Sequence, residues 1–217
     1  MIRHTAPPSA RVPLWLLAAF AVIWLALAIA PRYRADWLLE NVLVLVVVPW
    51  LVWAWRRLPL SNGAYVAIFC FLVLHLVGAH YTYSEVPYDQ WSQAIFGHSP
   101  GQLLGFERNH YDRLVHFLYG VLVMPAAVEL LAARAPSRGG WAILLPICFV
   151  MSHSVIYETI EWVAAEVFGG DLGIAYLGTQ GDVWDAHKDM ALAALGAVLA
   201  RFALAWHACG VRPGAER

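Results

Sequence analysis

Six long apolar segments, separated by short polar breaks, dominate the pattern of residues along the chain. They cover roughly residues 13–30, 37–55, 64–82, 111–132, 141–164 and 186–207. A helix needs about 20 mostly apolar residues to cross a bilayer, and each segment is close to that length. The breaks "PRYR", "RRLPLSNG" and "RAPSRGG" have the composition of loops. The pattern therefore predicts an all-α, polytopic membrane helix bundle with six transmembrane helices.

The composition favours a membrane protein over a soluble one. Of the 217 residues, 61% are hydrophobic and 13% are charged, whereas soluble domains carry about 25% charged residues. The net charge of −1 and the lack of a basic stripe argue against a nucleic-acid partner. The three cysteines have no metal-binding spacing and are interpreted as small hydrophobic residues. We expect one integral-membrane domain over residues 1–217, surrounded by membrane lipid, with its oligomeric state left open.

The first apolar segment has two interpretations. Arg3, His4 and Arg11 precede it, and it ends in Ala28-Ile29-Ala30, which has the small-x-small form of a signal-peptidase site. Its apolar run of 18 residues is longer than the roughly 7–15 residues usual in a secretory signal. A retained helix is therefore favoured over a cleaved one.

Two connections, 83–110 and 165–185, are much longer than the others. Loops longer than about 12–15 residues are usually either functional or disordered. Both stretches contain Trp, Tyr, Phe and Leu, so we predict that they are ordered.

The basic residues predict the orientation in the membrane, because cytoplasmic loops are enriched in Lys and Arg. With both termini cytoplasmic, nine basic residues lie inside and five lie outside. The acids are distributed more unevenly, since only Glu129 and Glu216 of the 15 fall on the cytoplasmic side. We expect a multi-pass protein of the cell inner membrane with both long loops outside.

Ionisable residues from several segments fall at a similar depth near the predicted outer face. Asp112 and His116 are four residues apart, and Glu158 and Glu161 are three apart, so each pair shares one helix face. The last segment starts with three acids at spacings of three and four: Asp182, Asp185 and Asp189. Arg113 and Lys188 are expected to be the cations at this level.

Such a cluster is expected to face the bundle interior, because a charge at the bilayer centre costs at least about 2.5–3.5 kcal/mol. Crowded carboxylates take up a proton or a cation, and carboxylates with imidazole suit Zn, Mn or Fe, or Mg where imidazoles are few. We predict a divalent metal (Zn, Mn or Mg) with ligands Asp112, His116, Glu158, Asp182 and Asp189. Glu161 or Asp185 is predicted to be the catalytic base, and Arg113 to hold an anionic head group.

Each of these residues also has a structural interpretation. Asp182 and Asp185 are candidates for capping the last helix, because acids are favoured at helix N-termini. Asp112 and Arg113 are candidates for an interfacial ion pair, and Lys188 for a local counter-charge. His75 and His153 are expected to form hydrogen bonds, and Glu40 is expected to be interfacial.

Three stretches, "RNHYDRLVHFLYG", "YETIEW" and "GTQGDVWDAHKDMALAALGA", resemble the YjdF-like family of bacterial inner-membrane proteins. The resemblance implies the predicted topology and no particular reaction. It marks nine motif positions: Asp112, Arg113, His116, Glu158, Glu161, Gln180, Asp182, Asp185 and Asp189. The order of these motifs is more distantly similar to VanZ-like proteins, which are associated with the cell envelope and glycopeptide resistance.

Three functions remain open at the level of the sequence. The first is an intramembrane, metal-dependent enzyme that acts on a lipid or lipid-linked envelope substrate. The second is a proton- or cation-coupled transporter, since intramembrane carboxylates often carry protons or cations. The third is a structural membrane subunit, in which the charged residues fix helix packing without catalysis.

Overall fold

The computed structural model describes residues 11–57 and 60–210, and within these ranges the regular structure is entirely helical. The longer helices are α1 (Arg11–Leu27), α2 (Arg34–Ala54), α3 (Asn62–Tyr81), α6 (Tyr111–Arg134), α7 (Trp141–Phe168) and α9 (Asp185–Gly210). The shorter ones are η1 (Tyr83–Glu85), α4 (Tyr88–Phe96), α5 (Pro100–Leu104) and α8 (Gly170–Leu177). Five residues used in the sequence predictions lie outside the described ranges: Arg3, His4, Arg212, Glu216 and Arg217.

The six longer helices coincide with the six predicted apolar segments, which confirms the predicted membrane helix bundle. Five of them, α2, α3, α6, α7 and α9, are long and apolar enough to cross a membrane. The sixth, α1, is apolar but has only 17 residues. Many large apolar side chains point outward from these helices, as expected where lipid tails cover a bundle.

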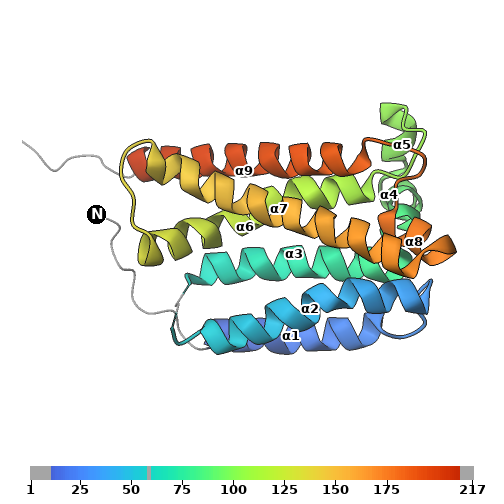
Figure 1. The fold of residues 1–217 in the computed structure, drawn as a ribbon, viewed down its shortest axis with the longest axis horizontal. Helices are drawn as coiled ribbons and strands as arrows, with labels where there is room; N and C mark the ends of the chain where they lie inside the picture. The colour runs from blue at the N-terminus through green and yellow to red at the C-terminus, as the bar shows by residue number, and fades with distance from the viewer. Residues whose placement is uncertain (1–10, 58–59, 211–217) are drawn as a thin grey trace, which may run out of the picture.

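The helices form two groups that pack together along their lengths (Figure 1). In one group α3 contacts α1 and α2, and Phe20 of α1 is buried against Ile68 and Leu72 of α3. In the other group α6 and α7 both pack against α9, around a core that includes Met124 and Val150. Contacts between α3 and α6 join the groups, so that α6 is central to the bundle.

The two long connections are ordered, as predicted. Residues 83–110 contain η1, α4 and α5, and α8 lies within residues 165–185. All four short helices lie at the end of the bundle where α6 and α9 begin (Figure 1). They therefore surround the helix ends that carry most of the predicted site residues.

Two glycines allow α6 and α9 to approach closely. A Cβ on Gly120 would collide with the backbone of Ala193 and Ala197, and one on Gly196 would collide with the backbone oxygen of Phe117. Gly120 follows His116 by one turn, and Ala193 follows Asp189 by one turn. The close contact between the two helices therefore lies one turn from the predicted site. It sets the distance between His116 of α6 and Asp189 of α9.

Candidate functional site

The residues closest to a metal-ligand arrangement are Asp112, His116 and Asp189, which lie in the first two turns of α6 and of α9. One ligand atom from each of the three lies within 4.8 Å of the others. Asp112 and His116 share a face because they are four residues apart, and Asp189 is brought to them by the close packing of α6 and α9. The side chains are well protected, and only 2% of the Asp189 surface is exposed.

Glu158 of α7 contacts this group through His116, although it is not one of the three residues whose ligand atoms all lie within 4.8 Å of one another. The Nε2 atom of His116 lies 3.4 Å from Asp112 Oδ1 and 3.4 Å from Glu158 Oε1. Two ligands that are each about 2.1 Å from a tetrahedral zinc ion lie about 3.4 Å apart. The spacing around His116 therefore suits direct coordination of one cation. We call Asp112, His116, Glu158 and Asp189 the carboxylate–histidine cluster.

Two oxygens of this cluster lack the hydrogen bonds that buried carboxylates normally have, although one of them lies 3.4 Å from His116 Nε2. Asp189 Oδ1 and Glu158 Oε1 are both buried, and neither accepts a hydrogen bond within the described part of the chain. Leaving such a group unsatisfied costs about 1–3 kcal/mol, and more when it is charged. A bound cation would satisfy both oxygens, so the donor set and its unpaired atoms fit a divalent metal.

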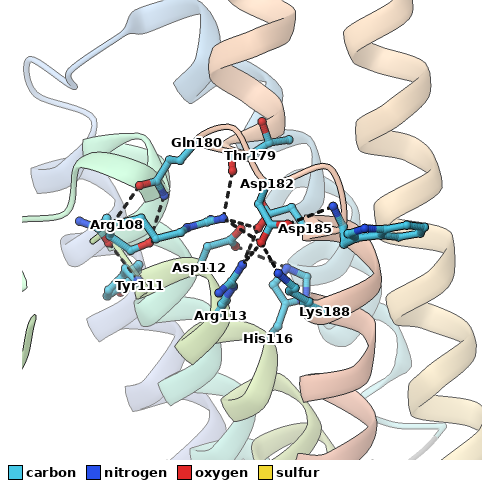
Figure 2. Close-up of polar contacts among 12 residues, drawn as sticks. Arg108, Tyr111, Asp112, Arg113, His116, Thr179, Gln180, Asp182, Asp185 and Lys188 are labelled. Atoms are coloured by element: carbon cyan, nitrogen blue, oxygen red, sulfur yellow. Dashed lines mark hydrogen bonds and ion pairs between the residues drawn. The ribbon is translucent and has the colours of Figure 1, made fainter. Parts of the chain in front are cut away.

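Asp182 and Asp185 are not part of the carboxylate–histidine cluster, because two arginines hold them at the neighbouring loop (Figure 2). Arg113 Nη2 lies 2.5 Å from Asp182 Oδ2 and 3.3 Å from Asp185 Oδ1. Arg108 Nη1 lies 2.7 Å from Asp185 Oδ1 and 3.6 Å from Asp182 Oδ2. We call these four residues the arginine–aspartate cluster.

The arginine–aspartate cluster ties the start of α6 to the loop before α9. Arg108 also donates to the backbone oxygen of Thr179, and Gln180 exchanges hydrogen bonds with the backbone of Asn109 (Figure 2). Gln180 has a positive φ of 49°, a conformation that few non-glycine residues adopt. These contacts hold the two segments in register, which supports a positioning role for the cluster.

The carboxyl group of Asp182 is held in its ionised form. Its pKa falls from the ordinary 3.8 to about 2, first because Lys188 Nζ donates to it and then because the Trp184 backbone N–H and Arg113 donate to it. The predicted counter-charge role of Lys188 is thus confirmed, with Nζ 2.6 Å from Asp182 Oδ2. Arg113 pairs with these loop acids, so the interpretation of Asp112 and Arg113 as an ion pair is wrong.

Arg108 and the acids of α2 were missed by the sequence interpretation. Arg108 joins Arg113 and Lys188 as a cation at this level, although it precedes the apolar segment and looked like a loop residue.

Glu40, expected to be interfacial, is only 3% exposed and accepts a hydrogen bond of 3.0 Å from the Tyr157 hydroxyl. Asp36 is buried beside it and accepts from Thr82. Asp36 and Glu40 are four residues apart, and this spacing was the available signal.

Both histidines assigned to hydrogen bonding do form hydrogen bonds. The ring of His75 contacts the Glu40 backbone oxygen at 3.0 Å and the Tyr83 hydroxyl at 2.5 Å. His153 contacts the backbone oxygen of Phe149 at 2.8 Å. Neither belongs to the carboxylate–histidine cluster, and Glu161, one turn beyond Glu158 on α7, lies outside the three-residue ligand group as well.

A cavity of about 660 Å³ extends from His116 between α2, α3, α6 and α7. Most of its lining is apolar, with residues such as Leu72, Val123 and Ile160, and Tyr157 is among its polar residues. Its volume lies within the roughly 300–1,000 Å³ typical of ligand pockets. The carboxylate–histidine cluster therefore borders an apolar space inside the bundle.

Comparisons with known proteins agree on a membrane family. The family described as "Predicted membrane protein (DUF2238)" matches residues 12–209. The chain is 37% identical over 180 residues to "Inner membrane protein YjdF" of Escherichia coli (strain K12), which covers 80% of this chain and 82% of the relative. No solved structure matches. The relative and the apolar helices support a multi-pass inner-membrane location.

Proposed function

This chain belongs to the DUF2238 family of membrane proteins, and from that premise we propose that it is an intramembrane, metal-dependent enzyme acting on a lipid or lipid-linked envelope substrate. The single observation that carries the proposal is the pair of unsatisfied, buried oxygens on Asp189 and Glu158, beside His116. A proton would satisfy one such oxygen, whereas a divalent cation would satisfy both at once and would also use the imidazole beside them as a ligand.

We assign the four members of the carboxylate–histidine cluster as metal ligands. Three carboxylates with one imidazole suit Zn or Mn, and Mg is the alternative for an oxygen-rich site. A divalent ion held there supplies a Lewis acid that polarises a phosphoryl or carbonyl oxygen of the substrate. Glu161, one turn further along α7 and free of the arginines, is proposed as the general base.

Asp182 and Asp185 receive a different role from the one predicted by their spacing. Their carboxylates are paired with Arg108, Arg113 and Lys188, which compete with a metal ion for the same oxygens. We propose that they position the loop before α9, and through it Asp189. Arg113 is paired with both acids, so we do not assign it to the head group of the substrate at the carboxylate–histidine cluster.

The substrate class follows from the space beside the cluster. The apolar cavity of about 660 Å³ reaches His116 from between the helices, so an acyl or polyprenyl chain would place its polar end at the cluster. The distribution of basic residues favours an orientation with this end of the bundle at the outer face of the inner membrane. A lipid or lipid-linked molecule in the outer leaflet is the substrate that this position favours.

Cation- or proton-coupled transport is the second candidate, and the buried acids of α2 favour it. Asp36 and Glu40 lie in the interior with Tyr157, so carboxylates continue beyond the carboxylate–histidine cluster. Uptake by proteoliposomes that is driven by an ion gradient and lost in Glu158→Gln would support transport. Turnover of lipid without ion uptake would support the enzyme.

The proposal is tested by measuring the metal content of protein that has been purified without any chelator. We expect about one divalent ion per chain and at least about a hundredfold weaker binding in Asp189→Asn, since loss of even outer-shell partners costs 10–100-fold. Asp171→Asn is the matched control, because Asp171 is an exposed acid of α8 at the same end of the bundle. Protein that folds normally but contains no stoichiometric metal would refute the metal-dependent mechanism.

A further inference from the structure

A second hollow lies on the other side of α6 from the apolar cavity. This groove has a volume of about 780 Å³ and runs between α5, α6 and the first turns of α9. Its walls are apolar, with Leu104, Phe106, Leu114, Phe117 and Leu192 among them. It shares none of its lining residues with the cavity beside His116. The two hollows are therefore separate binding spaces.

Cationic side chains are placed at one end of the groove. Arg113 and Lys188 both line it, and so does His110, whose ring centroid lies 4.0 Å from that of Phe106. Among the ion-paired residues here, three cations (Arg108, Arg113 and Lys188) face two carboxylates, Asp182 and Asp185. The formal charge of these five residues is +1, although each of the three cations has an ion-pair partner.

The cationic side chains near this end of the groove differ in how accessible they are. Arg113 Nε and Arg108 Nη2 are buried donors without an acceptor in the described part of the chain. Lys188 remains half exposed, so its ammonium group can reach a second anion beside Asp182. Lys188 is therefore the cation of the rim that is accessible to an anion in the groove.

The apolar half of the groove faces the region that lipid occupies. Leu104 of α5 is 66% exposed, and its neighbours Leu103 and Phe106 are exposed as well. Exposed apolar side chains at the end of a transmembrane bundle are suited to the interface between head groups and acyl chains. An occupant that combines an anionic head with an apolar tail would match both halves of the groove.

We propose that this groove binds an anionic phospholipid of the surrounding bilayer, with its phosphate at Arg113 and Lys188 and an acyl chain along Leu114, Phe117 and Leu192. The site goes beyond the proposed enzyme function, because it is separate from the carboxylate–histidine cluster and needs no metal. Its occupant would brace α5 and the loop before α9 against α6. Basic side chains next to an anionic leaflet favour such binding generally, and here they also flank an apolar slot.

Native mass spectrometry of the protein, released from nanodiscs containing equal amounts of phosphatidylglycerol and phosphatidylcholine, tests this site. We expect one retained phosphatidylglycerol per chain in the wild type. Lys188→Gln should lower its retention about fivefold, the factor equivalent to about 1 kcal/mol, and Lys188→Arg should preserve it. Arg32→Gln is the matched control, since Arg32 is an exposed cation that pairs with Glu85 outside the groove.

A second variant tests the apolar half. Ala191 is exposed and lines the groove, so Ala191→Trp should fill it and displace the acyl chain while leaving every charge in place. Reduced phosphatidylglycerol retention in both Lys188→Gln and Ala191→Trp, with unchanged metal content, supports the proposal. Equal retention of the two lipids by the wild type, or wild-type retention in both variants, would overturn it.

Discussion

The close approach of α6 and α9 gives the sharpest test of how packing supports the candidate site. In Gly120→Ala, the new Cβ would lie 2.6 Å from the Ala197 backbone nitrogen and still closer to the Ala193 backbone oxygen. Ordinary contact begins at 3.4 Å, and a helix backbone cannot move aside as a flexible side chain can. The two helices must therefore separate locally by about 1 Å, a strain typical of overpacked cores.

This separation has two measurable consequences. Overpacking of this kind costs about 1–3 kcal/mol, so the variant should unfold at a lower temperature in detergent. The contact lies one turn from His116 and one turn from Asp189, so the metal ligands on the two helices should also be pulled apart. Metal–ligand distances tolerate only about 0.2 Å, and we expect metal affinity to fall at least about tenfold.

Thermal unfolding and metal titration of the same preparations measure the two effects. Gly63→Ala is the matched control, because a Cβ there meets only Ser61 Oγ at an ordinary 3.8 Å. Alanine in the first turn of α3 should be neutral or stabilising by up to about 1 kcal/mol. An unfolding temperature for Gly120→Ala equal to that of Gly63→Ala would refute the packing argument, whatever the metal result. Loss of stability with unchanged metal affinity would refute the link to the ligands.

Two other predictions concern the arginine–aspartate cluster. The pKa of Asp182 is lower in the folded protein than its ordinary 3.8, so its ion pairs stabilise the protein above about pH 4 and are lost as pH falls toward 2. The difference in unfolding temperature between the wild type and Asp182→Asn should therefore be largest near neutral pH and shrink over this interval, and a constant difference would contradict it. Arg108→Gln removes the hydrogen bond of 2.7 Å to the buried Asp185 carboxylate and leaves Arg113 at 3.3 Å, and the loss of such a charged hydrogen bond costs about 1.5–3 kcal/mol. Chemical unfolding measures this cost, with Arg134→Gln as a control at the opposite end of α6; equal stability of the two variants would contradict the assignment.

The helices themselves could be predicted from the sequence, because the length of an apolar segment is set by the thickness of the bilayer. The same is true of residues that share a helix face, such as Asp112 with His116. Spacing along one helix determines these neighbours without reference to the rest of the fold. The order within the long loops was also indicated by their aromatic and leucine content.

The tertiary structure alone decided which acids meet one another. Asp182, Asp185 and Asp189 have equivalent spacing, yet the first two pair with arginines and only Asp189 reaches His116. The difference arises because α9 packs against α6 through Gly120 and Gly196, which sets the height of each acid relative to Arg113 and His116. Hydrophobic periodicity specifies that a helix is buried but does not specify which helix it contacts or at what height. Contacts between distant segments therefore decide which carboxylates are neutralised and which remain free to bind a cation.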